Sequence, residues 1–294
     1  MRVRFWGTRG SIAAPGPGTL HFGGNTSCIE LTTPAGASLV LDCGTGARLL
    51  GNKLLSNGSG SICATILLTH THWDHIQGFP FFAPIFVSEN HFNVYGPDES
   101  HLSLRDVLAG QMEHHYFPVE LDQLAARIVY QDLKEGTYEI AGVTVKTQEM
   151  NHPSPTLGYR FELGGSSMCY LSDHEPYFED VWREGATPGR LESIREPGDR
   201  RHAEFMQAAH VVIHEAQYTP EEYPAKRHWG HSSYAYVVEL AAAAGVRRLF
   251  LTHHDPSHDD AAVADIEARA RALAAKLGSP LEVSCAYEGL EVSF

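Results

Sequence analysis

The sequence predicts an α/β protein in which short strands alternate with helices along most of the chain. Two observations support this fold class. Short apolar runs bounded by Gly, Pro, Asn and Asp recur throughout, as expected for strands. Residues 260–277 carry apolar side chains at helical spacing, and Gly278 follows them as a typical helix stop.

The individual elements follow from the same patterns. The predicted strands are residues 3–5, 27–31, 39–41, 65–68, 93–95, 143–147, 158–162, 168–171, 211–213, 249–251, 281–284 and 290–292. A second helix should begin after Ser232-Ser233 and end at Gly245. The Gly- and Pro-rich stretch 8–24 predicts a loop, and the charged stretch 183–201 predicts a surface excursion.

Length and composition are those of a single-domain enzyme. A chain of 294 residues can bury a large core, and we expect one domain that spans residues 1–294. No apolar run approaches the length of a membrane span, and the alternating start 1–6 lacks the apolar core of a signal peptide. The five cysteines form no CxxC pair, so we expect neither a disulfide framework nor a zinc ribbon. These features predict a cytoplasmic protein without membrane contact.

The charge balance limits the class of partner. The formal net charge is −14, with 36 acidic residues against 22 Lys and Arg. A long polyanion requires a basic stripe, so a large nucleic acid is disfavoured as a partner. A small anionic substrate remains compatible, because bound metal ions would supply a local positive field.

The most informative stretch is His70-Thr71-His72-Trp73-Asp74-His75, which follows the apolar run Ile66-Leu67-Leu68. Two imidazoles one residue apart can point to the same side of an extended segment and bind one cation. The Asp74-His75 pair on the following turn would reach a second cation. Imidazole combined with carboxylate suits zinc, manganese or iron better than magnesium or calcium. The alternative, a polar loop rich in histidine, would leave buried imidazoles without partners, which is costly.

Further ligand-type residues each follow a strand-like run; they are Asp42, His152, Asp173 and His253. Together with the HxHxDH motif, their order resembles that of the metallo-β-lactamase superfamily, and the resemblance spans most of the chain. It implies a four-layer αββα sandwich, in which two mixed sheets carry helices on their outer faces and the metals lie at one edge between the sheets.

The resemblance also implies a ligand set. His70, His72 and His152 would bind the first metal, Asp74, His75 and His253 the second, and Asp173 would bridge them. Two divalent transition-metal ions per chain are therefore expected, with zinc favoured and manganese or iron as alternatives. Asp42 would orient an imidazole from behind the ligands, although a turn role in its Gly-rich loop fits equally well. His254 is an alternative to the adjacent His253, and the family spacing favours His253.

Asp173, at the bridging position, argues against the β-lactamases proper within this superfamily, because those enzymes typically have a Cys at the matching position. His214-Glu215-Ala216 and Gly230-His231-Ser232-Ser233 resemble two motifs of the tRNase Z-like and cyclic phosphodiesterase branch. In that branch the Glu orients the His, and the His contacts the scissile phosphate or protonates the leaving oxygen. The alternative is that Glu215 caps a loop and His231 caps a helix.

The reaction implied is two-metal hydrolysis through a metal-bridging hydroxide, with Asp74, Glu215 and His231 as catalytic residues. The favoured substrate is a small phosphodiester, such as a cyclic nucleotide or cyclic phosphate. The Gly/Pro-tipped arm with which tRNase Z holds tRNA is not evident between His75 and His152, so tRNA 3′ processing is less favoured. Hydrolysis of a lactone, ester or thioester is the alternative. A diiron oxidoreductase would need a flavodoxin-like domain, which does not fit within this length.

The candidates for contact with substrate are Asn25, His114, His115 and Tyr116. Asn25, like Arg9, could face a phosphate or could pin its own loop. The other three are expected in a loop between a helix and a Pro. The aromatic residues of the run 79–86 fit the core or a subunit interface, and the second alternative leaves a homodimer open.

Overall fold

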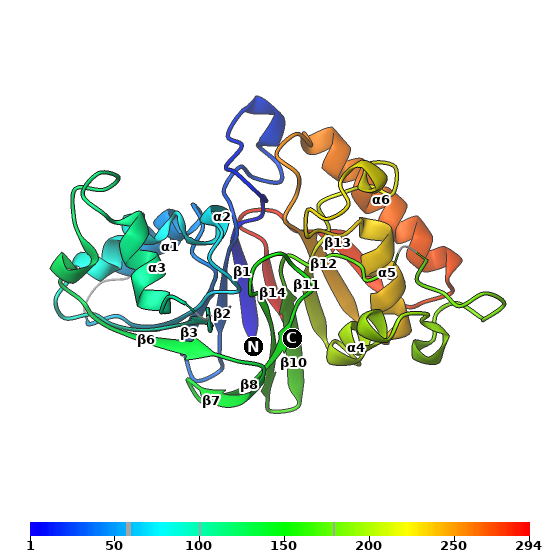
Figure 1. The fold of residues 1–294 in the computed structure, drawn as a ribbon, viewed down its shortest axis with the longest axis horizontal. Coiled ribbons are helices and arrows are strands. Elements are labelled where there is room, and N and C mark those ends of the chain that lie inside the picture. Colours follow the sequence, from blue (N-terminus) through cyan, green and yellow to red (C-terminus); the bar gives the residue numbers. More distant parts are fainter. Residues whose placement is uncertain (57–59, 100, 179) are drawn as a thin grey trace.

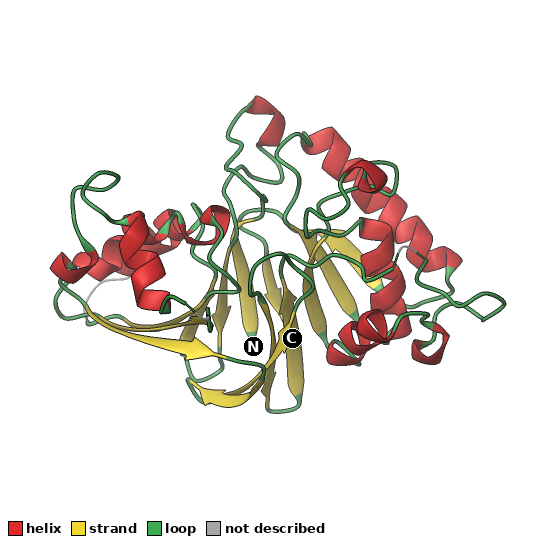
Figure 2. Ribbon diagram, in the orientation of Figure 1, coloured by secondary structure: helices red, strands yellow, loops and turns green. Residues whose placement is uncertain are grey.

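The computed structural model describes residues 1–56, 60–99, 101–178 and 180–294 as two seven-stranded sheets with helices on their outer sides (Figures 1 and 2). The predicted αββα sandwich is thus confirmed. The two chain ends lie side by side, and the amino group of Met1 donates to the carbonyl of Phe294 at 2.8 Å.

The first sheet has the strand order β14-β1-β2-β3-β4-β5-β6. Its strands are β1 (Arg2–Gly7), β2 (Cys28–Thr32), β3 (Ser38–Leu41), β4 (Cys63–Leu67), β5 (His91–Pro97), β6 (Arg127–Leu133) and β14 (Glu291–Ser293). Strands β3 to β6 run parallel, whereas β14, β1, β2 and β3 pair antiparallel.

The second sheet has the order β13-β12-β11-β10-β9-β8-β7. Its strands are β7 (Gly136–Ile140), β8 (Val143–Glu149), β9 (Leu157–Leu163), β10 (Ser166–Leu171), β11 (Val211–Glu215), β12 (Arg248–Thr252) and β13 (Glu282–Cys285). Strands β10 to β13 are parallel. Every residue of β11 is buried, because this central strand is covered on both faces, and its apolar run is therefore continuous.

The helices are α1 (Ala47–Ser56), α2 (Trp73–Ile76), α3 (Leu104–Gln111), α4 (Pro197–Phe205), α5 (Tyr234–Ala243) and α6 (Asp260–Lys276). Helices α1 and α3 cover the first sheet, and α4, α5 and α6 cover the second (Figure 1). The predicted long helix is confirmed as α6. Val263, Ile266 and Ala270 are buried along one side, Asp259 caps its first turn, and Gly278 follows its end at φ +64°.

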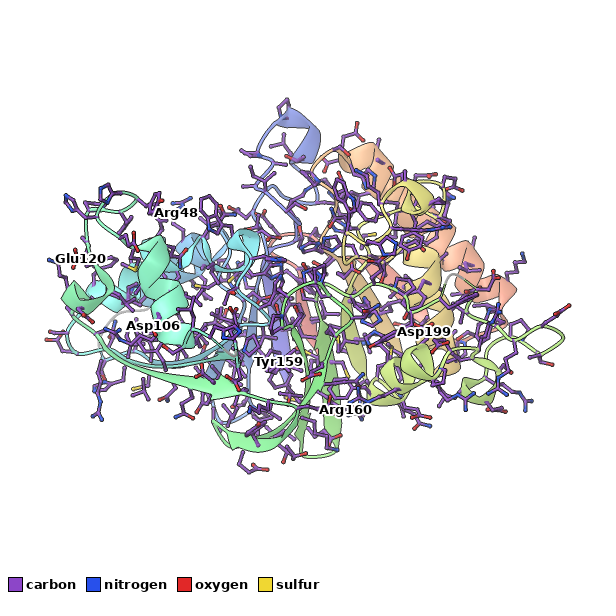
Figure 3. The ribbon with its side chains drawn as sticks, viewed as in Figure 1. Arg48, Asp106, Glu120, Tyr159, Arg160 and Asp199 are labelled. Atoms are coloured by element: carbon purple, nitrogen blue, oxygen red, sulfur yellow. The ribbon has the colours of Figure 1, made fainter. Side chains whose placement is uncertain are left out.

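One apolar cluster fills the space between the sheets. Phe5 and Leu39 of the first sheet meet Phe161 and Tyr170 of the second there. The second sheet is also tied to the metal-ligand segment, because the hydroxyl of Tyr159, at the centre of Figure 3, donates to the carbonyl of Leu68 at 2.6 Å. This contact fixes the chain that leads to His70.

Three differences from the sequence prediction concern the edges of the molecule. Strands β6 and β7 were not among the predicted strands. The segment 183–201 is exposed at its start, but Ile194 and Asp199 are fully buried, and α4 begins inside it. In the aromatic run, Phe79 and Phe82 are core residues, whereas Phe81 is 57% exposed. Among the described residues, no helix has the length and apolar character needed to cross a membrane.

Candidate metal centre and active site

The ligand candidates lie on turns at the carboxyl ends of strands. Asp42 directly follows β3 with φ 59°, Asp173 lies two residues after β10 with φ 31°, and His253 directly follows β12 with φ 60°. Left-handed backbone at a non-glycine residue is uncommon, and such residues gather at functional sites. The three turns direct polar side chains toward the same edge of the sandwich.

Seven side chains meet at this edge. The ligand atoms of His70, His72, His152 and Asp173 lie within 4.8 Å of one another, as do those of Asp74, His75 and His253. The carboxylate of Asp173 faces both groups. Its Oδ2 lies 3.4 Å from Nε2 of His70, and its Oδ1 lies 3.3 Å from Nε2 of His253. This arrangement is the one expected of a bridging carboxylate.

The donor set fits two divalent transition-metal ions. Nε2 of His70 is buried without a hydrogen-bond partner, and Nε2 of His152 lies 3.1 Å from Nδ1 of His72. Burial, aided by the neighbouring His75, lowers the pKa of His70 to about 4, so this imidazole is neutral at pH 7 and can offer a lone pair. Imidazole and carboxylate donors suit zinc, manganese and iron.

Three of the ligand imidazoles are oriented through their Nδ1 atoms. Nδ1 of His75 donates to Oδ2 of Asp42 at 2.8 Å, which is one of the two roles that the sequence left open for this carboxylate. Nδ1 of His152 donates to the carbonyl of Gly230 at 2.9 Å, and Nδ1 of His253 to Oε1 of Gln217 at 3.0 Å. These bonds select the tautomer that leaves Nε2 free for a metal.

Sequence reasoning missed several of these supports. Gly230 acts through its backbone carbonyl, and Ser11 acts through its backbone N–H, which donates to Oδ2 of Asp74 at 2.7 Å. No side-chain pattern can reveal such contacts. Gln217 follows Glu215 by two residues, and this proximity to a recognised motif is the only signal that pointed to it.

The structure brings Glu215 and His231 to the centre but separates them by more than a hydrogen bond. Oε2 of Glu215 and Nδ1 of His231 are 3.9 Å apart. The carboxylate instead accepts from the backbone N–H groups of Gln217 and Ser232. Burial raises the pKa of Glu215 to about 8. Glu215 therefore fixes the turn that carries His231 through the backbone.

His231 faces the centre, and its Nδ1 has no hydrogen-bond partner. That atom is buried, forms no hydrogen bond and lies 3.9 Å from Oδ2 of Asp173. The ring stacks against His253 with a centroid distance of 5.1 Å. His231 also forms a third group of ligand-type atoms with Asp173 and His253.

Three other candidates point elsewhere. Nε2 of His254 donates to the carbonyl of Ala286 at 2.9 Å, so the geometry favours His253 as the ligand. Arg9 is fully buried, and its Nε donates to the carbonyl of Gly23 at 2.7 Å. Nδ2 of Asn25 donates to Glu288 at 2.9 Å. Arg9 and Asn25 thus pin loops, and the expected contact of Asn25 with substrate has no support in this geometry.

The expected substrate wall is also displaced from the centre. His114 and His115 line a cavity of about 440 Å³ that contains none of the ligand candidates, and Tyr116 is 73% exposed. Glu120, at the edge of Figure 3, lines the same cavity. A cavity of about 630 Å³ borders His152 instead, and its walls come from the segments around Tyr177 and Tyr223.

Comparison with known proteins identifies the family. Residues 38–191, just over half of the chain, match the family described as "Beta-lactamase superfamily domain". The chain belongs to the β-lactamase superfamily. It is a metal-dependent hydrolase of this superfamily, with the metallo-β-lactamase fold. The matched segment includes the HxHxDH motif, His152 and Asp173, but not His253.

Relatives and solved structures extend the similarity over the whole chain. Ribonuclease Z of Gemmatimonas aurantiaca is 27% identical, with 98% of each chain covered. Ribonuclease Z of Kineococcus radiotolerans is 25% identical, with 86% of this chain and 85% of the relative covered. The metallo-β-lactamase fold protein YhfI from Bacillus subtilis has a TM-score of 0.67 at 17% identity, with 99% of both chains covered. Human tRNase Z, short form, has a TM-score of 0.64 at 20% identity, with 100% and 99% covered.

Proposed function

We propose that this protein is a dinuclear metal-dependent phosphodiesterase that acts on a small diester. The observation that carries the proposal is the position of His231. Its Nδ1 is buried, forms no hydrogen bond and lies 3.9 Å from the bridging candidate Asp173. An imidazole that is not needed as a ligand, yet faces the reacting centre, suits proton transfer to a leaving oxygen.

The proposed ligands are the seven side chains already described. His70, His72 and His152 would hold one ion, Asp74, His75 and His253 the other, and Asp173 both. Zinc is the favoured ion, with manganese or iron as alternatives. Two such ions, when bound, lower the pKa of water and neutralise charge on the phosphoryl oxygens.

The protein's own residues would complete the reaction. Burial lowers the pKa of His231 to about 3 in the free protein, so its imidazole would first take up a proton when the anionic diester binds. It would then give that proton from Nδ1 to the departing alkoxide, because an alkoxide is a poor leaving group unless it is protonated. Glu215 would keep the turn in place through its bonds to the N–H groups of Gln217 and Ser232. Asp42 and Gln217 would keep the imidazoles of His75 and His253 aligned.

Two further observations support a phosphorus ester as the substrate. Two relatives of similar length are ribonucleases Z, and one fold neighbour is a diphosphatase from the PhnP family. The acidic net charge of −14 supports a small substrate. Between His75 and His152 the described residues build β5, α3 and β6 to β8, which belong to the layers of the sandwich.

The decisive experiment compares substrate classes at equal metal loading. Manganese- or zinc-loaded enzyme should hydrolyse bis-p-nitrophenyl phosphate far faster than a lactone or a thioester, and it should not trim precursor tRNA at its 3′ end. A higher kcat/KM for the lactone or thioester would replace the proposal by the ester-hydrolase alternative. Efficient, site-specific trimming of tRNA would refute the small-substrate part.

A further inference from the structure

The cavity beside His152 shares this candidate ligand with the metal centre. Its volume is about 630 Å³, within the range of about 300–1,000 Å³ that is typical of small-molecule sites. It is lined by Asn151 and His152 and by the segment that follows Asp173, and Nδ2 of Asn151 donates to the carbonyl of Glu175 at 2.8 Å. A substituent of an ester held at the centre could therefore enter this cavity.

Three aromatic side chains line the cavity. Tyr177 is 46% exposed and Phe178 is 39% exposed, although both line the cavity, and Tyr223 is half-buried there. Large apolar side chains left open in a concave site are characteristic of ligand contact. Flat rings offer their faces to other flat rings at little entropic cost.

These rings are held in place before any ligand binds. The backbone N–H of Tyr177 donates to Oδ1 of Asp199 at 3.0 Å, and its ring packs edge-on against His174 at 5.9 Å. Asp199 lies in α4 on the helical side of the second sheet (Figure 3). The guanidinium of Arg195 covers one face of Phe178 at 4.0 Å. A preorganised platform loses little freedom on binding, which favours affinity.

The charges argue against a second phosphate in this cavity. Among the described lining residues, the two carboxylates of Glu175 and Asp180 outnumber the one guanidinium, that of Arg227. The carboxylate of Glu175 already accepts hydrogen bonds from the backbone N–H groups of His228 and Gly230. The cavity therefore suits a neutral, flat group with polar edges.

We propose that this cavity binds the nucleobase of a nucleoside phosphodiester, with the base against Tyr177 and Phe178. This inference rests on the proposed phosphodiesterase function, because it takes the diester phosphate to the metal centre. A nucleobase combines the π-face that the aromatic walls require with edges that can hydrogen-bond to Asn151 or His228.

The test compares two diesters that share a leaving group, thymidine 5′-p-nitrophenyl phosphate and methyl p-nitrophenyl phosphate. Metal-loaded wild-type enzyme should have a kcat/KM for the thymidine ester at least about 10-fold above that for the methyl ester. Tyr177→Ala and Tyr177→Leu should each lose about 10-fold on the thymidine ester and erase most of this preference. The leucine variant keeps the apolar bulk, so it isolates the aromatic face.

Phe178→Ala has a matched control in Phe86→Ala. Both phenylalanines are 39% exposed, but Phe86 ends the 3₁₀ turn η3 (Ala83–Phe86) and lines none of the described cavities near His152. Phe178→Ala should reduce the preference for the thymidine ester, and Phe86→Ala should leave it unchanged. An unchanged preference in all Tyr177 and Phe178 variants would overturn the nucleobase assignment.

A binding measurement separates this inference from the proposed function. Titration of metal-loaded protein with AMP and with methyl phosphate should show tighter binding of AMP, weakened about 10-fold by Tyr177→Ala. Binding of this kind without hydrolysis of either diester would retain the nucleobase site and refute the phosphodiesterase. Hydrolysis of both diesters without any preference would refute only the nucleobase site. Absence of both signals would refute both.

Discussion

Gly230 donates its backbone N–H to Oε2 of Glu175 at 2.9 Å. The carbonyl of the same glycine accepts from Nδ1 of His152, also at 2.9 Å. Its φ is +86°, and a Cβ there would lie 2.2 Å from Nδ1 of His152, so a side chain at this position would collide with the imidazole. Glu175 thus positions the imidazole of His152 through the backbone of Gly230.

Glu175→Gln should therefore weaken both the fold and the centre. The new amide would direct an N–H group at backbone donors of His228 or Gly230, and the free energy of unfolding should fall by about 1–3 kcal/mol. Metal retained after dialysis should fall as well. Urea unfolding and elemental analysis measure the two effects. Glu192→Gln, whose side chain is 72% exposed, is the control, and equal behaviour of the two variants would contradict the prediction.

Asp42→Asn should reduce metal affinity without removing a ligand. Oδ2 of Asp42 accepts from Nδ1 of His75 at 2.8 Å and from the hydroxyl of Tyr170 at 2.6 Å. Loss of such an orienting carboxylate typically costs about 10- to 100-fold in metal affinity. Competition with a chromophoric chelator measures the affinity. Asp265→Asn, at a side chain that is 66% exposed, should have no effect, and an unchanged affinity in Asp42→Asn would show that Asp42 is only a turn residue.

His253 and His254 should differ in metal content. Nε2 of His253 lies 3.0 Å from Oδ2 of Asp74, whereas Nε2 of His254 is bonded to Ala286. His253→Ala should lower the content from about two equivalents to about one, and His254→Gln should keep about two, as expected of a dinuclear centre with one ligand changed. Elemental analysis of protein purified without chelator would show which of the two histidines is the ligand. Loss of metal in His254→Gln alone would reverse the assignment.

His231→Ala should retain both metals and lose turnover. General-acid assistance is typically worth about 10²–10⁴-fold, which sets the loss expected for a diester with a poor leaving group. A nitrophenyl ester needs little protonation and should lose less. Glu215→Gln should reproduce part of the defect, and the double variant should be little worse than His231→Ala. Wild-type turnover of His231→Ala on poor leaving groups would remove His231 from the mechanism, and loss of metal would make it a ligand.

Two buried histidines outside the centre should make stability depend on pH. Nε2 of His202 and Nε2 of His214 are 2.8 Å apart, and burial lowers the pKa of His214 to about 4 and that of His202 well below its usual value. The unfolded chain therefore binds more protons, and the free energy of unfolding should fall as the pH drops from about 6.5 toward 4.

In this pH range, each histidine that is neutral only in the folded protein should change the free energy of unfolding by about 1.4 kcal/mol per pH unit. His202→Gln should lower the slope by up to this amount, as measured by urea unfolding at pH 7, 6 and 5. His91→Gln, at an exposed histidine, should keep the wild-type slope. Equal slopes in all proteins would mean that the pair does not control acid stability.

The sequence predicted the ligand cluster well because the relevant signals are local. His70 to His75 form one motif, and Asp173 and His253 each follow a buried apolar strand. Strand β6 lacked such a signal. It is an edge strand in which only Leu133 is fully buried, so its apolar pattern is weak. Strand β7 is also at an edge, and only Ile140 is buried.

The cavity proposed to bind substrate could not be predicted, because it depends on which loops meet in space. His114 and His115 have the composition expected of a substrate contact, yet they line a cavity remote from the ligand candidates. Tyr177 and Tyr223, separated by many residues, line the cavity next to His152. Their proximity results from the bonds of Glu175 to Tyr223 and His228, which are long-range contacts.

The ligand candidates are divided between the two sheets, and this division has a consequence for biogenesis. Four of them follow β4 of the first sheet, and the other three follow β8, β10 and β12 of the second. His253 lies 178 residues beyond His75. On the proposed assignment, a nascent chain that has exposed only strands β1 to β6 lacks the bridging carboxylate and cannot hold two ions. Metal loading must therefore follow the translation of both halves, and a chain arrested between them would be synthesised without a functional centre.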